Sequence, residues 1–155
     1  MEFSPAVLFV MAMLSVVMET EGCMCEFLSL REYFCQADFA VKAIPSNWTT
    51  DNDLEAAKST FTLNILHSYK MPSFLANETE ITVSSWESDG LCGINPGRPS
   101  YGQQHQRTHR PIFITGEVRE DGTLWTQLCS HIALSWRWIP KPQRRTIKKF
   151  PNLTC

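Results

Sequence analysis

Six cysteines constrain the fold of this 155-residue chain more than any other feature. They are Cys23, Cys25, Cys35, Cys92, Cys129 and Cys155. An even number of cysteines in an oxidising compartment predicts a framework of disulfides, but the spacing alone leaves their pairing open. Cys23 and Cys25 cannot easily bond to each other. Both point to the same face of an extended segment, so each is expected to reach a different, distant partner.

The amino terminus predicts export to such a compartment. Residues 6–18 form an uncharged apolar run that is too short to cross a bilayer. Thr20 and Gly22 have the spacing that a signal peptidase reads, so we predict a signal peptide over residues 1–22 and a secreted, extracellular chain that begins at Cys23. The alternative is a buried amino-terminal helix, because Glu2 precedes the apolar run where a signal peptide usually carries Lys or Arg.

Two further observations favour disulfides in a secreted glycoprotein. The Asn-x-Thr sequons at Asn47, Asn77 and Asn152 are candidate glycosylation sites. Zinc binding is the alternative use of the cysteines. The Cys-Met-Cys start lacks the two-residue gap of a zinc knuckle, and an exported chain oxidises its thiols.

Alternating apolar residues predict a mainly β fold in a single domain over residues 23–155. The expected strands cover residues 39–43, 61–69, 81–83, 112–118 and 123–129, and helical spacing is found over 27–35 and 139–150. Asp121-Gly122 predicts a tight hairpin turn between the last two strands. Five short antiparallel strands favour a small closed or partly open barrel with short flanking helices. Residues 95–110, rich in Gly, Pro, Gln and Arg, predict a long loop.

Catalytic machinery is not evident in the sequence. It contains no His-Glu-x-x-His, no Gly-x-Ser-x-Gly and no phosphate-binding glycine loop, so we do not expect an enzyme. His105 and His109 have metal-ligand spacing but fall in the long loop, where a solvated polar loop is the simpler interpretation. His67 continues the inward row of its strand and is predicted to be a core side chain, whereas His131 gives no chemical signal.

Charge is nearly balanced overall but not along the chain. With 14 Lys and Arg against 16 Asp and Glu, the chain is not expected to bind nucleic acid. No acidic residue follows Asp121, and basic residues crowd the last predicted helix: Arg137, Lys141, Arg144, Arg145, Lys148 and Lys149. This face is either an ordinary solvated helix surface or a site for a sulfated glycan or an acidic partner.

The order of several motifs resembles the amino-terminal, netrin-like domain of the tissue inhibitors of metalloproteinases. Cys-Met-Cys at residue 23 is followed by Phe-Cys-Gln-Ala-Asp-Phe-Ala-Val-Lys-Ala at 34–43, Leu-Cys-Gly at 91–93, Ile-Thr-Gly at 114–116, Leu-Cys-Ser at 128–130 and Gln-Arg-Arg at 143–145. The resemblance covers residues 23–155. It implies an oligonucleotide-binding-type (OB-fold) barrel and three disulfides: Cys23–Cys92, Cys25–Cys129 and Cys35–Cys155.

The resemblance also implies a mechanism of inhibition. The free α-amine and the carbonyl of Cys23 would chelate the zinc of a matrix-type metalloproteinase and displace its water. Met24 would fill the specificity pocket of the protease. Further contacts would come from Cys25, Glu26 and the strip Asp89, Gly90, Leu91 and Cys92. The chain would act as a monomer, one to one, with no cofactor of its own and no membrane span.

Three features depart from the family pattern. Glu26 replaces the small or apolar residue common after the second cysteine, and a desolvated charge there costs binding energy unless it is paired. The sequence ends at Cys155, so no separate carboxy-terminal domain is expected, and the loop 95–110 is longer than usual.

The alternative function is a netrin-like binding module that inhibits nothing and uses its basic last helix for a sulfated glycan or a cell-surface partner.

Overall fold

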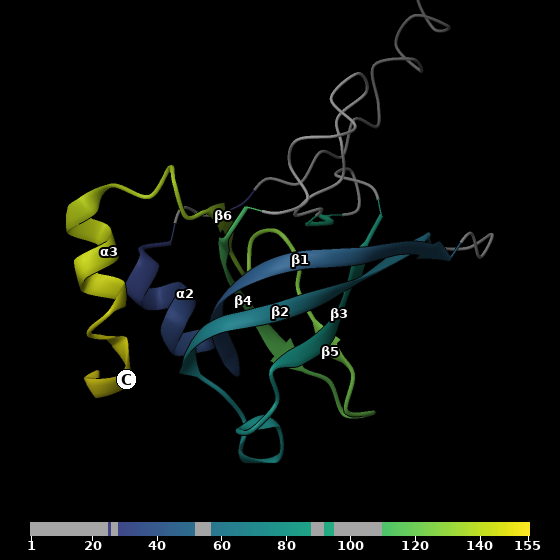
Figure 1. Cartoon of the computed structure of the whole chain (residues 1–155), viewed down its shortest axis with the longest axis horizontal. Helices are drawn as coiled ribbons and strands as arrows, with labels where there is room; N and C mark the ends of the chain where they lie inside the picture. The colour runs from purple at the N-terminus through teal and green to yellow at the C-terminus, as the bar shows by residue number, and fades with distance from the viewer. Residues whose placement is uncertain (1–24, 26–27, 52–56, 88–91, 95–109) are drawn as a thin grey trace, which may run out of the picture.

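The computed structural model describes residues 25, 28–51, 57–87, 92–94 and 110–155. In these parts of the chain it contains a strongly bent sheet and two short α-helices (Figure 1). The strands are β1 (Phe39–Asp51), β2 (Lys58–Lys70), β3 (Glu80–Trp86), β4 (Ile112–Val118), β5 (Leu124–Trp125) and β6 (Ala133–Ser135). The helices are α2 (Leu30–Gln36) and α3 (Lys141–Ile147), with 3-10 turns η1 (Ser73–Leu75) and η3 (Phe150–Asn152).

Five of the strands close into a ring. The sheet order is β1-β2-β3-β5-β4, and β4 pairs back onto β1 between residues 112–116 and 39–43. All of these pairings are antiparallel except the short parallel contact of β3 with β5. The ring confirms the expected small barrel and is consistent with an OB-fold-like domain. Closing the sheet into a ring removes exposed strand edges.

The barrel interior holds the apolar rows that the sequence predicts. Phe39, Val41, Phe61, Leu63 and Val83 are each fully buried in one cluster. Gly116 of β4 permits close packing there, because a Cβ at this position would overlap the ring of Phe39 and the carbonyl oxygen of Trp125.

A second apolar cluster joins the outside of the barrel to the helices. Ala40 and Phe113 lie on the outer face of β1 and β4, and they pack with Phe34 of α2 and with Ile147 and Phe150 at the carboxyl end. The first residues of β1 (39–41) and of β4 (112–116) are therefore buried on both faces, which explains the consecutive apolar residues at 39–41 and 112–114.

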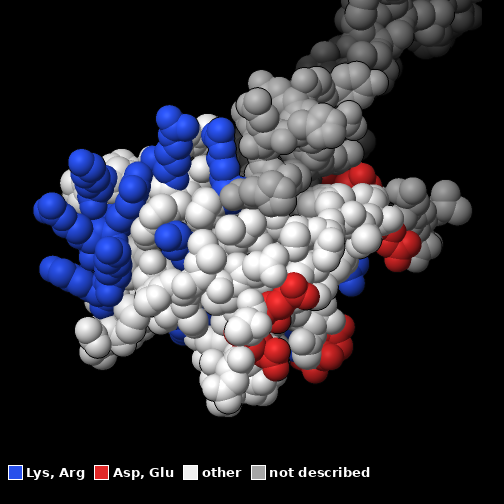
Figure 2. Space-filling view, in the orientation of Figure 1, with Lys and Arg blue, Asp and Glu red and all other residues white. Residues whose placement is uncertain are grey.

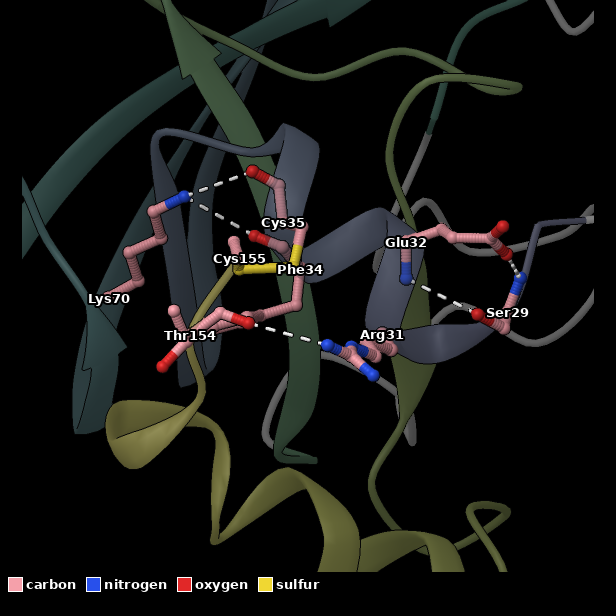
Figure 3. The surroundings of a disulfide bond; sticks show 8 residues. All are labelled: Ser29, Arg31, Glu32, Phe34, Cys35, Lys70, Thr154 and Cys155. Atoms are coloured by element: carbon pink, nitrogen blue, oxygen red, sulfur yellow. Dashed lines mark hydrogen bonds between the residues drawn. A yellow bond between two sulfur atoms is a disulfide. The ribbon is translucent and has the colours of Figure 1, made fainter.

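Helix α2 begins three residues later than expected because Ser29 caps it. The Ser29 hydroxyl accepts from Glu32 N–H (3.3 Å), and Glu32 accepts from Ser29 N–H (2.6 Å). Hydrogen bonding of the Glu32 carboxylate to Ser29, first to its backbone N–H and then to its side chain, lowers the pKa of Glu32. At the other end, the Lys70 ammonium donates to the carbonyls of Phe34 and Cys35, at 3.4 and 3.3 Å (Figure 3).

The Cys35–Cys155 disulfide ties α2 to the carboxyl terminus (Figure 3). Arg31 of α2 reinforces this connection by donating to the Thr154 carbonyl at 3.3 Å. Helix α3 starts after Pro140, with Pro142 in its first turn, and ends at Ile147, short of the predicted range. No helix in the described residues is long and apolar enough to cross a membrane.

Two strand predictions need correction. The strand expected over residues 123–129 is only Leu124–Trp125, because the chain leaves the sheet and turns toward Cys129, which has a left-handed backbone (φ 78°). A sixth strand, β6, pairs with β4. The sequence does not predict it, because three residues are too few to show an alternating pattern.

Two disulfides are found among the described residues, Cys25–Cys129 and Cys35–Cys155. The third implied disulfide, Cys23–Cys92, cannot be compared with the structure, because Cys23 lies outside the described residues.

The prediction that His67 is a core side chain is wrong, because its side chain is exposed. Register irregularities between Ala40 and Val41, and between Lys42 and Ala43, interrupt the inward–outward alternation of the β1–β2 ladder. His67 consequently sits outside the barrel, edge-on to the ring of Tyr69 at 4.5 Å between centroids.

Candidate functional site

The predicted protease-contact residues come from two segments that are far apart in the sequence. Cys25 and Cys92 are within the described residues. The other predicted residues, Cys23, Met24, Glu26, Asp89, Gly90 and Leu91, lie outside them. We call the predicted protease-contact residues the candidate edge. Cys25, Cys92 and their surroundings show how this edge is attached to the barrel.

A single turn between β5 and β6 holds both segments. Cys129 in this turn forms the disulfide with Cys25, with the two Cα atoms 4.7 Å apart. The neighbouring Leu128 donates its N–H to the Cys92 carbonyl at 2.7 Å. The turn thus brings Cys25 and Cys92 to one place on the barrel.

The Cys92 segment is also fixed to the barrel from its other side. Ile94 N–H donates to the hydroxyl of Ser85 on β3 at 2.8 Å, and both residues are buried. Cys92 itself has a left-handed backbone (φ 59°), which turns the chain between these two anchors. The backbone is held by hydrogen bonds at Cys92 and Ile94, two residues apart, which restricts movement of this segment against the turn.

His131 closes the turn, although no sequence pattern singled this residue out. Its side chain is 4% exposed, and its Nδ1 accepts from Gln127 N–H at 3.4 Å. The His131 N–H in turn donates to the Gln127 carbonyl at 3.1 Å. Burial lowers the pKa of His131, while the negative charges of Glu117 and Asp38 act in the opposite direction. The fold therefore favours the neutral imidazole.

We predict that the stability of this protein falls as the pH drops below the ordinary histidine pKa of 6.5. His131 binds a proton more readily in the unfolded chain than in the folded one, so its contribution is complete above that pH and is lost as the pH falls through and below it. The loss is at most ~1.4 kcal/mol per pH unit. Urea unfolding at a series of pH values measures it.

The matched control is His131→Asn, whose side-chain oxygen can accept from Gln127 N–H without titrating. This variant should show a shallower dependence of unfolding free energy on pH between pH ~7.5 and pH ~5.5. Equal pH dependence in the two proteins would show that His131 does not control the stability of the turn.

The remaining candidates have simpler outcomes. No group of metal-ligating side chains is found among the described residues, and His105 and His109 lie outside them, as does the predicted loop except for Arg110. The side chains of Asn47, Asn77 and Asn152 are exposed, so all three sequons lie at the surface. Their glycosylation stays a prediction.

Comparison with known protein families decides the assignment. The family model for the tissue inhibitor of metalloproteinase matches residues 21–155, a range that includes all six cysteines. The chain belongs to this family. No match to a curated protein is found. The tissue inhibitors of metalloproteinases are inhibitors rather than enzymes, and the family assignment implies a metalloproteinase as the partner. The five-stranded ring and the Cys25–Cys129 and Cys35–Cys155 disulfides agree with the framework that the resemblance implies.

Proposed function

We propose that this protein is a secreted inhibitor that binds one zinc metalloproteinase at its active site and chelates the zinc through Cys23. The observation that carries the proposal is the β5–β6 turn. It holds Cys25, two residues after the proposed chelator, by a disulfide and holds Cys92 by a backbone hydrogen bond. Two strips that must contact the same protease are thereby attached to the same point of a closed barrel.

The chelating groups are the α-amine and the carbonyl of Cys23, which displace the water on the protease zinc. Coordination requires an unprotonated amine. An unperturbed α-amine has a pKa of about 8, and the charge of a nearby zinc ion favours loss of its proton at neutral pH. The disulfide of Cys25 supports this role, because attaching the chain two residues after Cys23 lowers the conformational entropy lost on binding.

Specificity would come from the residues that flank the second cysteine. Met24 has a flexible thioether that suits a deep apolar pocket better than a shallow one. Glu26 brings a charge to the interface, which favours proteases that offer a cation to pair with it. Contacts from Asp89, Gly90 and Leu91 would flank the zinc on the side of Cys92.

The proposed setting is extracellular, with signal peptide cleavage after Gly22 and a monomeric inhibitor without a cofactor of its own. The apolar run at 6–18, the surface sequons and the disulfides support it. Cleavage at that position is essential to the mechanism because it creates the free α-amine of Cys23.

The test is mass spectrometry of the amino terminus of the secreted protein, followed by titration of the same sample against a panel of matrix metalloproteinases. A free Cys23 with stoichiometric inhibition supports the mechanism. A free Cys23 without inhibition of any panel member would favour the non-inhibitory binding module and direct attention to Glu26. A different first residue would eliminate Cys23 as the chelator.

A further inference from the structure

A cleft of about 560 Å³ lies on the outer face of the barrel beside α3. It is lined by Lys42 and Trp136, by Lys148 directly after α3, and by Leu66, His67 and Tyr69 of β2. Three basic or imidazole side chains and two aromatic rings therefore face one space. None of the lining residues is acidic.

Within the described residues, the basic side chains of this cleft form no ion pair with a carboxylate. The ion pair found in the described part of the chain joins Arg119 to Glu117, on the β4–β5 hairpin away from the cleft, at 3.7 Å. The Lys42 ammonium instead stands over the ring of Trp136, 4.9 Å from its centroid. Burial raises the pKa of Tyr69, so its hydroxyl adds no negative charge at neutral pH.

Helix α3 extends this positive surface beyond the cleft. Lys141 and Arg145 are exposed on α3 itself. Exposed basic side chains also flank it, at Arg137 before the helix and at Lys148 and Lys149 directly after it. Figure 2 shows these basic side chains gathered at the α3 end of the molecule, and the acidic side chains visible in this view lie elsewhere. The sequence prediction of a locally basic last helix is thus confirmed, and Lys42 joins it from β1 through the fold.

Part of this surface is ordered in advance of any ligand. Arg144 donates to the carbonyls of Ile139 and Arg137, at 2.7 and 2.9 Å, and its guanidinium lies 5.7 Å from the centroid of the Trp136 ring. These contacts hold Arg144 and fix the backbone that leads into α3. A cation and a ring that are already placed lose less entropy when they bind a ligand.

We propose that the cleft and the exposed face of α3 bind a sulfated polysaccharide. The cations would neutralise sulfate groups along the chain, and the aromatic walls of the cleft would pack against the apolar faces of a sugar ring. Trp138, 72% exposed next to Arg137, offers a second ring beside the basic residues. An acidic peptide would use the charges but not these flat aromatic surfaces, so the observations favour the saccharide.

This site is separate from the cysteine-anchored edge. Helix α3 packs through Ile147 and η3 on the outer cluster with Phe34 and Tyr69, whereas Cys25 and Cys92 are held at the β5–β6 turn. Figure 1 shows α3 flanking the barrel beside α2. Polysaccharide binding therefore does not depend on the proposed inhibition, and the two can be measured independently.

The experiment uses the full secreted protein and a heparin octasaccharide, with binding followed by calorimetry at several salt concentrations. We expect binding that weakens steeply between ~50 and ~200 mM salt, because neutralising a polyanion releases its counterions. Lys42→Gln/Lys148→Gln should weaken binding about 10- to 100-fold. The matched control is Lys58→Gln/Arg119→Gln, which removes the same charge from residues near Trp125 and should change binding less than about 3-fold.

Three results would overturn the proposal. The first is no octasaccharide binding by the unaltered protein at physiological salt. The second is an equal loss in the two double variants, which would show attraction to net charge without a site. The third is binding of polyglutamate as tight as that of the octasaccharide, which would assign the surface to an acidic polypeptide. Circular dichroism of each variant checks that the barrel is intact.

Discussion

Adding one residue ahead of Cys23 is expected to weaken metalloproteinase inhibition by at least about 1,000-fold, which corresponds to about 4 kcal/mol of binding free energy. The added residue converts the chelating α-amine into an amide, which cannot donate a lone pair to zinc, and it places extra atoms where the metal lies. A variant with Ala inserted between Gly22 and Cys23 provides this form. Titration against a protease that the unaltered protein inhibits measures the loss.

The matched control carries one extra Ala after Cys155. This residue is at the opposite end of the chain, where Cys35–Cys155 ties the terminus to α2. It should leave inhibition within about 3-fold of the unaltered protein, because it is remote from the proposed contact edge. Mass spectrometry must show the intended amino terminus in both forms. If the amino-terminal extension inhibits as well as the unaltered protein, zinc chelation by Cys23 is wrong.

Removing the Cys25–Cys129 disulfide is expected to lower both stability and inhibition. The disulfide closes a chain segment of 104 residues, and loss of such a bond typically costs about 2–5 kcal/mol of unfolding free energy. Because Cys25 is the described attachment of the amino-terminal segment to the β5–β6 turn, Cys25→Ser/Cys129→Ser should also weaken inhibition about 100-fold per folded molecule. Urea unfolding and active-site titration measure the two effects separately.

The variant Cys35→Ser/Cys155→Ser is the control that separates the attachment of Cys25 from the overall stability of the fold. This disulfide closes a segment of 120 residues and joins α2 to the carboxyl terminus. Its removal should therefore lower the free energy of unfolding by a similar amount, about 2–5 kcal/mol. Inhibition by the folded fraction should change less than about 3-fold, because the attachment of Cys25 is untouched. Equal losses of inhibition in the two variants would show that the Cys25–Cys129 bond does not position the edge.

Local patterns were sufficient to predict most of the strands. The limits of β4 agree with the expected range 112–118, and the apolar rows of β1, β2 and β3 are buried in the barrel. The Asp121-Gly122 turn also forms as expected: Gly122 has φ 82°, and Thr123 N–H donates to the Asp121 carboxylate at 2.8 Å. Each of these features depends on neighbours within a few residues, which is the range over which periodicity and turn chemistry act.

The errors arise where contacts between distant segments overrule the local pattern. His67 follows an inward row in the sequence, but β2 has an extra, unpaired residue on each side of it, at Leu66 and near Tyr69, and His67 lies on the outer surface. The predicted strand 123–129 stops at Trp125, because the chain turns there toward the disulfide with Cys25. An extra residue in β2 is defined only by its register against β1, so the periodicity of the β2 sequence alone does not reveal it.

The sequence by itself determined a mainly β, disulfide-linked domain, its similarity to the tissue inhibitors of metalloproteinases and a basic last helix, because these follow from residue types, their spacing and their order. Only the tertiary structure decided that one turn holds Cys25 and Cys92 together, and that Lys42 meets Lys148 and Trp136 in a cleft. The physical reason is that ring closure and helix packing join residues far apart in the chain, and those contacts are set by the whole core.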